Sequence, residues 1–168
     1  HTDQRFIWNF QTEPEIELNR RNILWPRGKV FGGSRSINGM LYVKGAPHRY
    51  DEWRDGNNPG WGYNELLPYF RKLEDRRESN HLDRGVGGPI KISSGSYRDK
   101  LSDAFFQACV DVGAKPNEDY NLNFDGVGWL QYSTKKGLRC STSSTYLKIS
   151  KKNRNLKIIT NAEVEKII

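Results

Sequence analysis

The sequence has few of the residues that build metal sites and disulfide frameworks. Its 168 residues include 2 Cys and 3 His. Cys109 and Cys140 are too few and too far apart for a zinc site or a CxxC motif. Cys109 shares an apolar helical face with neighbours at helical spacing, so we expect it to pack in a core. Nothing indicates a disulfide framework, and the redox compartment and localisation stay open.

Long apolar runs are also absent. No stretch approaches the roughly 18 consecutive apolar residues that a membrane-spanning helix needs. The start, His1–Arg5, is polar and lacks the apolar core of a signal peptide. The single methionine is Met40, and Ala162–Ile168 reads as a strand in mid-course. We therefore expect the chain to be an excerpt of a longer protein or a processed product.

Positive charge is in excess, but it is dispersed. Lys and Arg number 27 against 20 acids, a net charge of +7. Such a balance permits binding to nucleic acid, anionic membranes or phosphate-bearing ligands. The densest basic run, Lys148–Arg154, is more typical of a solvated surface segment than of a nucleic-acid patch. We expect no nucleic-acid partner, although a basic binding module stays open as an alternative function.

What the sequence does contain predicts a packed domain of mixed helices and strands. Hydrophobic residues make up 35% and aromatic residues 12%, which argues against disorder. The charged segment 76–87 predicts an exposed loop, and residues 6–10 a short buried stretch. Periodicity predicts four helices. The first covers 48–55, the second starts at Asn64 as its N-cap, the third covers 99–112 with Gly113 at its end, and the fourth is a short helix from its cap Ser141 to Leu147. It predicts strands over 89–93, 126–133, 156–160 and 162–168.

The most unusual region is Gly28–Gly45, called here the glycine loop. Its five glycines alternate with short polar residues, and paired glycines let a backbone adopt positive φ and approach a ligand closely. If a helix begins after Gly33, its N–H groups would face an anion or an electron-rich ring. The loop matches neither a Walker A motif nor a GxGxxG fingerprint. By itself the pattern favours a structural turn somewhat over a ligand cradle.

A longer pattern decides between these readings. The run Gly28-x-Val30-x-Gly32-Gly33-Ser34-x-Ser36-x-Asn38-Gly39-Met40-x-Tyr42, followed by Asp51-x-Trp53, resembles the first signature of glucose–methanol–choline oxidoreductases. The resemblance continues through Gly60-Trp61, Leu67–Phe70, Gly126–Gly128, Gln131, Gly137-x-Arg139-x-Ser141, Tyr146-Leu147, Asn155-Leu156 and Val164. It implies an α/β (α+β mixed) fold: part of a Rossmann-like FAD-binding domain with part of an antiparallel-sheet substrate domain. The implied division is 1–45 in the FAD-binding domain, 46–150 in cap and substrate elements, and 151–168 in strands that return to the FAD-binding domain.

The resemblance also implies a cofactor and the residues that contact it. In the family this loop packs beside the pyrophosphate and isoalloxazine ring of FAD. Ile37 stands where some members carry the His that bonds FAD covalently, so noncovalent FAD is expected. Arg35 stands where a small residue is common, which could alter packing or charge near the cofactor. The residues assigned to FAD are Val30, Gly32, Gly33, Ser34, Asn38, Gly39, Met40 and Tyr42, with Val164 at the adenine.

The implied reaction is oxidation of an alcohol to an aldehyde or ketone, with hydride transfer to the flavin. The partners would be a small-molecule alcohol and an electron acceptor, either oxygen or a quinone-type carrier. The family's catalytic His would lie beyond Ile168, and its GxGxxG before this region. His48 and His81 read as ordinary exposed histidines, so we predict no catalytic residue here. The chain alone is expected to be inactive, and an inactive truncated family member stays open as an alternative.

Overall fold

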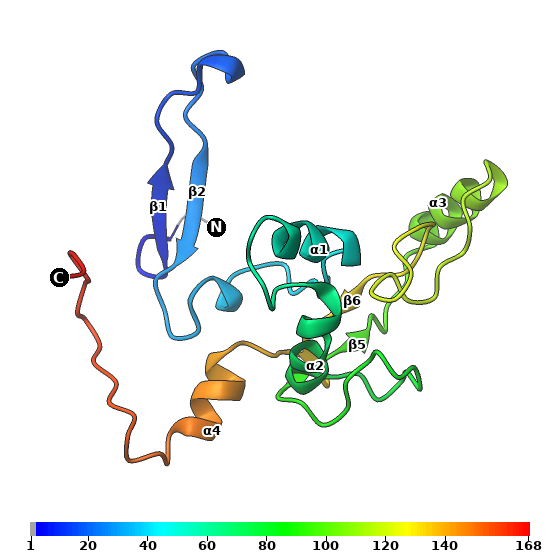
Figure 1. Ribbon diagram of the computed structural model, residues 1–168. Helices are drawn as coiled ribbons and strands as arrows, with labels where there is room; N and C mark the ends of the chain where they lie inside the picture. The colour runs from blue at the N-terminus through cyan, green and yellow to red at the C-terminus, as the bar shows by residue number, and fades with distance from the viewer. Residues whose placement is uncertain (1–2) are drawn as a thin grey trace.

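The computed structural model describes residues 3–168 and consists of short helices and two-stranded sheets joined by loops (Figure 1). This mixed composition agrees with the predicted fold class. Residues 1 and 2, part of the predicted polar start and first domain, lie outside the described residues. Within 3–168, no helix combines the length and apolar character needed to cross a bilayer. The helices are α1 (Pro47–Asp55), α2 (Tyr63–Leu73), α3 (Lys100–Asp111) and α4 (Lys148–Ser150), with 3-10 turns η1 (Ile16–Leu18) and η2 (Gly33–Ser36) and a π-helical turn η3 (Ser143–Leu147).

A long hairpin leads into the glycine loop. Its strands, β1 (Ile7–Gln11) and β2 (Leu24–Gly28), pair antiparallel with Ile7 opposite Gly28. The hairpin projects from the body of the molecule (Figure 1). Of the stretch predicted to be buried, Ile7 at the base is buried, whereas Phe10 further out is exposed. Because β2 ends at Gly28, the pairing fixes where the glycine loop starts.

The predicted helical segments form, with corrections at two caps. α1 begins at Pro47, where proline's fixed φ suits the first turn. α2 starts two residues earlier than predicted, with Gly62 and not Asn64 as its N-cap. Asp99 caps α3 by accepting a hydrogen bond from the Leu101 amide at 2.9 Å. The turn predicted to start at Ser141 is η3, whose N-cap is Thr142 and not Ser141, although Ser141 Oγ accepts from the Ser144 amide at 3.2 Å.

Three small sheets form the centre of the molecule. β3 (Glu74–Asp75) pairs parallel with β4 (Ile90–Lys91), β5 (Ser93–Ser94) pairs antiparallel with β6 (Gln131–Tyr132), and β7 (Thr134–Lys135) with β8 (Leu138–Arg139). The strands predicted near Ile90 and Trp129 therefore exist, but they are shorter than predicted. A small core of Tyr42, Ile90 and Ile92 lies beside them, with Leu73 of α2 packed against it.

The apolar face of α3 is not a core in this chain. Leu101, Phe105 and Val112 are 78%, 68% and 86% exposed, and Cys109 is only half-buried. The prediction that Cys109 lies in a core is therefore wrong for this chain. The helix instead packs through Phe106, which is beside that face.

Two further segments differ from the prediction. Residues 156–168 are extended and exposed but form no strand, because a strand needs a neighbouring backbone to pair with. They run from α4 back toward the base of the hairpin (Figure 1).

In segment 76–87, predicted to be an exposed loop, Arg76 and Arg84 are buried. Their charges are neutralised by nearby carboxylates, which single-residue polarity does not reveal.

Candidate cofactor site

The glycine loop folds back on itself at its first residue. The Gly28 amide donates to Ser34 Oγ at 3.2 Å, and the Gly33 amide donates to the Val30 carbonyl at 2.9 Å. A Cβ on Gly28 would fall less than 3.0 Å from backbone atoms of Gly33 and Ser34. Since neither backbone can move aside cheaply, only glycine permits this closure.

After Gly28, the loop has further glycines whose backbone is not covered by a side chain. Gly32 and Gly33 have φ values of 87° and 56°, in the left-handed region that glycine tolerates. Gly33 opens η2, the helical turn expected just after it. A Cβ on Gly33 or Gly39 would meet nothing within 4 Å. The missing side chains therefore leave open space against the backbone.

Residues about a hundred positions later also hold the loop in place. Arg139 Nη1 donates to the carbonyl of Asn38 at 2.7 Å and to its Oδ1 at 2.9 Å. Thr142 Oγ1 donates to the Gly32 carbonyl at 3.0 Å, and Arg35 Nε donates to the Cys140 carbonyl at 3.2 Å. Arg139 and Thr142 were not among the predicted site residues. The Gly137-x-Arg139-x-Ser141 match was the signal that could have found this support.

The later predicted residues lie in the anchored end of the loop. Asn38 Oδ1 also accepts from the Met40 amide at 3.1 Å, and Met40 itself has a positive φ of 64°. The Met40 carbonyl accepts from both the amide and the hydroxyl of Ser133. The Tyr42 side chain is buried with the core isoleucines, and this burial, with the negative charge of Glu74 added, raises the pKa of its phenol. Tyr42 is thus part of the core, unlike the open positions Gly33 and Gly39.

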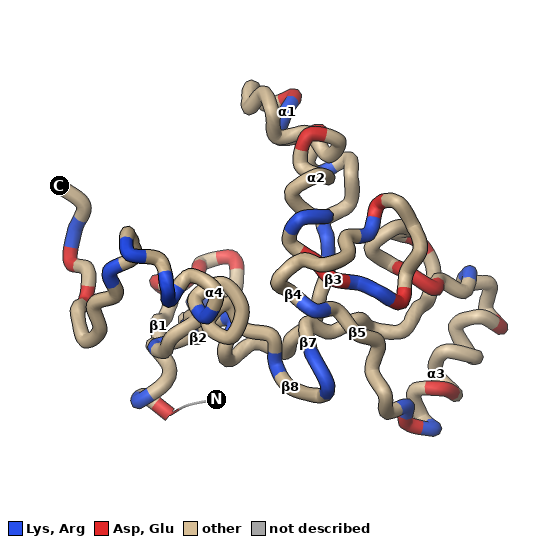
Figure 2. The backbone as a smooth tube through the Cα atoms, turned by 90° about the horizontal axis from the view of Figure 1, so that it is seen from below, with Lys and Arg blue, Asp and Glu red and all other residues tan. Residues whose placement is uncertain are grey.

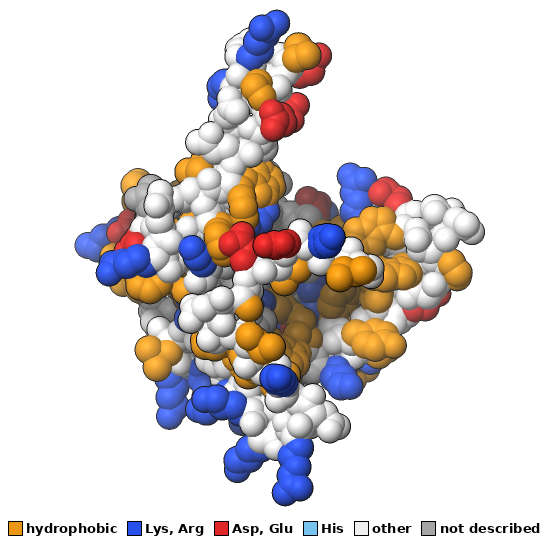
Figure 3. All heavy atoms as spheres, turned by 90° about the vertical axis from the view of Figure 1, so that its left-hand side faces the viewer, with side chains coloured by type: hydrophobic (Ala, Val, Ile, Leu, Met, Phe, Trp, Pro, Cys, Tyr) orange, Lys and Arg blue, Asp and Glu red, His pale blue; other side chains and the backbone are white. Residues whose placement is uncertain are grey.

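A cleft of about 860 Å³ lies where the start of the loop meets the extended C-terminal segment. Its volume is within the range of small-molecule sites. Figure 3 shows this side of the molecule hollowed below the hairpin, with hydrophobic and basic side chains around the hollow. The Lys29 ammonium lies 4.1 Å from the centre of the Trp8 ring. The cleft is lined by Arg5, Trp8, Gly28, Lys29, Val30, Phe31, Gly32 and Ile159–Glu163.

The predicted residues are brought together in part. Val30 and Gly32 line the cleft, and Gly33 and Ser34 follow directly in the same loop. Val164 is 82% exposed and adjoins the lining residue Glu163 without lining the cleft itself. The segment of Val164 and the start of the loop are therefore neighbours in space, although more than a hundred residues separate them in sequence.

The titratable side chains that line the cleft are Arg5, Lys29 and Glu163, and neither histidine lines it. Basic side chains and exposed backbone suit a phosphate-bearing ligand, and the aromatic side chains suit a flat ring. His48 and His81 are exposed, and His81 Nδ1 accepts from the Asp83 amide at 3.1 Å. Across residues 3–168, no group of three or more His, Cys, Asp or Glu side chains could hold a metal ion.

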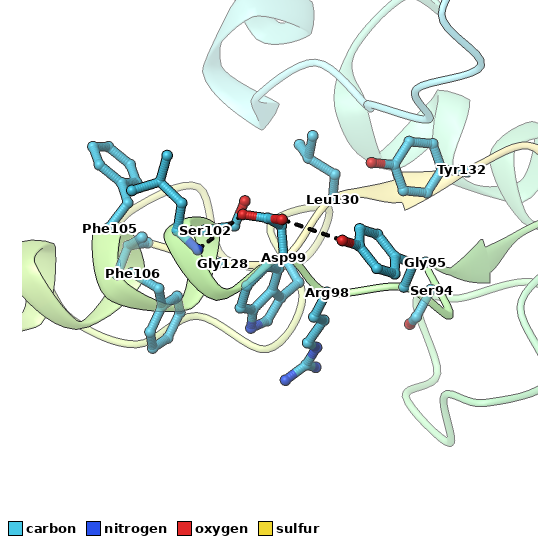
Figure 4. Close-up of a pocket in the computed structure, with 14 residues that line it drawn as sticks. Ser94, Gly95, Arg98, Asp99, Ser102, Phe105, Phe106, Gly128, Leu130 and Tyr132 are labelled. Carbon is cyan, nitrogen blue, oxygen red and sulfur yellow. Dashed lines mark hydrogen bonds between the residues drawn. The ribbon is translucent and has the colours of Figure 1, made fainter.

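A second hollow of about 690 Å³ lies beside α3, on the side of the molecule away from the hairpin (Figures 1 and 4). Phe106 and Trp129 stack there with ring centres 5.7 Å apart, and the Arg98 guanidinium lies 4.5 Å from the Trp129 ring centre. The Tyr97 hydroxyl donates to Asp99 at 3.2 Å (Figure 4). Because Asp99 already caps α3, these contacts account for the local structure without a ligand.

Curated relatives match nearly the whole chain. It is 38% identical over 168 residues to an oxygen-dependent choline dehydrogenase of Vibrio vulnificus, covering 98% of this chain and 30% of that protein. It is 39% identical over 156 residues to a protein of the same name from Sinorhizobium fredii, covering 92% and 28%. The chain thus spans less than a third of the length of these relatives.

Solved structures share the fold. Pyridoxine 4-oxidase from Mesorbium loti superposes with a TM-score of 0.85 at 29% identity, covering 92% of this chain and 31% of that one. An FAD-dependent oxidoreductase from Chaetomium thermophilum gives 0.77 at 28% identity, covering 87% and 28%. The family described as GMC oxidoreductase matches residues 12–168. By this match, which includes the whole glycine loop, the chain belongs to the GMC oxidoreductase family.

Proposed function

We propose that this chain is part of a longer FAD-dependent oxidoreductase that oxidises CH–OH groups, and that its glycine loop forms one wall of the flavin site. The observation that carries the proposal is the open space against Gly33 and Gly39, in a loop whose backbone is also held by Arg139. Backbone that has no side chain at these positions and is held in place nearby suits the close approach of a flat ring.

The residues around the loop fit the charge and shape of FAD. A pyrophosphate is doubly negative, and Lys29 places positive charge in the cleft, whereas the charge of Arg5 is paired with Asp3 at 2.6 Å. In this proposal the start of the loop meets the phosphates, and the segment that ends at Val164 meets the adenine. The residues proposed to hold FAD are Val30, Gly32, Gly33, Ser34, Asn38, Gly39, Met40, Tyr42 and Val164, with Tyr42 acting through its fixed backbone.

The proposed domain division follows from the same assignment. Residues 1–45 would belong to the FAD-binding domain, 46–150 to cap and substrate elements, and 151–168 would return to the FAD-binding domain. The contact between residues 159–163 and the start of the glycine loop supports this return.

When bound, FAD would accept the hydride from the alcohol and pass its electrons to an acceptor. The chain's own residues would bind and orient the cofactor and help to exclude water. We assign no catalytic acid or base to them, and neither His48 nor His81 lines the cleft. The chain alone should therefore be inactive, and the catalytic histidine should come from the rest of the longer protein.

The substrate is proposed only as a class, a small-molecule alcohol. Relatives are named for choline and pyridoxine, and a formate oxidase from Aspergillus oryzae has the same fold at 26% identity and a TM-score of 0.72. This range of names gives no basis for choosing one alcohol. The proposed acceptor is oxygen or a quinone-type carrier.

The test is to purify the longer protein and measure its visible flavin absorbance. A yellow protein that bleaches anaerobically with an alcohol and recovers with an acceptor would support the proposal. A protein that stays colourless after incubation with FAD would overturn it. The alternative of a basic nucleic-acid-binding module is less well supported, because the family match covers residues 12–168. Its best support is segment 126–162, which carries eight Lys or Arg and no acid, whereas elsewhere Lys and Arg lie among acids (Figure 2).

A further inference from the structure

A group of fully buried charges lies beside the end of the glycine loop. The side chains of Glu74, Arg84 and Lys44 are 0%, 0% and 1% exposed. Arg84 donates two parallel hydrogen bonds to Glu74, at 3.0 and 3.1 Å, and the Lys44 ammonium lies 3.2 Å from the same carboxylate. The Gly85 amide also donates to Glu74, at 2.7 Å. Such a carboxylate is neutralised and fully hydrogen-bonded, as burial requires.

Arg84 extends this group toward the core strands. Its Nη1 donates to Asp119 at 2.7 Å and to Gln131 Oε1 at 3.0 Å. Gln131 Nε2 in turn donates to Asp119 at 2.8 Å, and Asn121 Nδ2 donates to Gln131 Oε1 at 3.1 Å. A single guanidinium therefore ties together side chains from three separate segments of the chain.

These segments then hold the backbone of the glycine loop. The Tyr42 carbonyl accepts from Asn121 Nδ2 at 3.1 Å and from the Tyr120 hydroxyl at 2.8 Å. The Tyr42 amide donates to the Gln131 carbonyl at 2.9 Å, and the Lys44 amide donates to Asn121 Oδ1 at 2.5 Å. The Arg84 guanidinium also lies 5.9 Å from the centre of the Tyr42 ring. The network thus fixes one end of the loop, as Arg139 fixes its middle.

We infer that Arg84 is a positioning residue for the glycine loop: it orients Gln131 and Asn121, which fix the backbone of Tyr42 and Lys44. Its importance for the cofactor rests on the proposed function, whereas its effect on the loop does not. Two cations and two carboxylates balance within the group, so removing Arg84 would leave the buried Glu74 and the partly buried Asp119 with less compensation. Asn121 and Gln131 would then lose their fixed orientation.

The first test needs no cofactor and compares Arg84→Met with Arg76→Met by amide hydrogen exchange in the longer protein. Arg76 is a matched control because it is also buried, but it binds Glu78 and Ser94 instead. We expect exchange of the Tyr42 and Lys44 amides to rise about tenfold or more in Arg84→Met and to change little in Arg76→Met. Equal exchange at these amides in the two variants would overturn the inference.

The second test uses the same variants loaded with FAD. Arg84→Met should weaken FAD binding about tenfold and shift the visible flavin spectrum. Arg84→Lys keeps the charge but not the paired hydrogen bonds of the guanidinium, so it should restore part of the affinity and part of the spectrum. Arg76→Met should retain the wild-type spectrum even if its melting temperature falls equally. If the wild-type protein binds no FAD, the proposed function fails, and the exchange experiment still decides the role of Arg84. If Arg84→Met binds FAD with unchanged affinity and spectrum, its role in positioning the flavin site is refuted.

Discussion

Arg139 lies across the backbone of Asn38, and one nitrogen of its guanidinium contacts both the carbonyl and the side-chain oxygen of that residue, at 2.7 and 2.9 Å. The two residues are 101 positions apart. The loop shape is therefore set by a distant part of the chain as well as by its own glycines.

We predict that Arg139→Met weakens FAD binding by about ten- to a hundredfold, since the loop loses several hydrogen bonds to a charged group. Arg98→Met is the control, because it removes the same kind of side chain at a place away from the loop, where Arg98 lies over the Trp129 ring. Titration of the unliganded longer protein with FAD measures both affinities. Equal affinity in the two variants would show that the loop keeps its shape without Arg139.

Gly28 and Gly39 should respond differently to the same added methyl group. Gly28→Ala places a Cβ against backbone, so we expect a loss of about 2 kcal/mol or more in the free energy of unfolding. Gly39→Ala meets open space and should cost less than about 1 kcal/mol, but it should weaken FAD binding. Chemical denaturation and FAD titration separate the two effects. Normal FAD affinity in Gly39→Ala would mean that the flavin does not lie against this residue.

The periodic elements were predictable because their signals are local. The Asp99 cap and Gly113, with its φ of 98°, bound α3 as the sequence indicates. The glycine pattern likewise located the loop. The contact from Arg139 was indicated only by the Gly137-x-Arg139-x-Ser141 match. Local patterns gave no signal for it, because a hydrogen bond to a backbone carbonyl needs no complementary residue in the sequence. The buried position of Arg84 was missed for a related reason: a charged segment reads as exposed unless its partners are known.

The acid dependence of stability should include a contribution from Asp75. Burial raises its pKa, but the hydrogen bond from the Gly87 amide and the contact with Lys91 outweigh burial and lower the pKa below the ordinary 3.8. Because the unfolded state then binds the proton more readily, the stabilisation is complete above about pH 4 and is lost as the pH falls through the folded-state pKa. Asp75→Asn should be less stable at neutral pH, and its deficit should shrink below pH 4. Denaturant unfolding at several pH values measures this, and a deficit that stays constant into acid would refute the assignment.

Flavin in the longer protein should be noncovalent. Ile37 has no atom able to bond the isoalloxazine ring, unlike a histidine at this place. Acid precipitation should therefore release all visible flavin into the supernatant, where its spectrum identifies FAD. Flavin that stays with the pellet would require a covalent link to another residue. Ile37→Val, which preserves the apolar character, should release its flavin in the same way.

The extended segment 156–168 should gain a partner in the longer protein. Its alternating apolar residues, such as Ile158 at 41% and Val164 at 82% exposed, have the pattern of a strand. It forms no strand in this chain, because its backbone makes no hydrogen bonds to a neighbouring strand. A strand contributed by the rest of the protein would supply the missing hydrogen bonds. We therefore predict fast amide exchange for these residues in the isolated chain and exchange slower by about a hundredfold or more in the longer protein. Fast exchange in both would show that the segment stays outside any sheet, and would remove the support it gives to the adenine side of the flavin site.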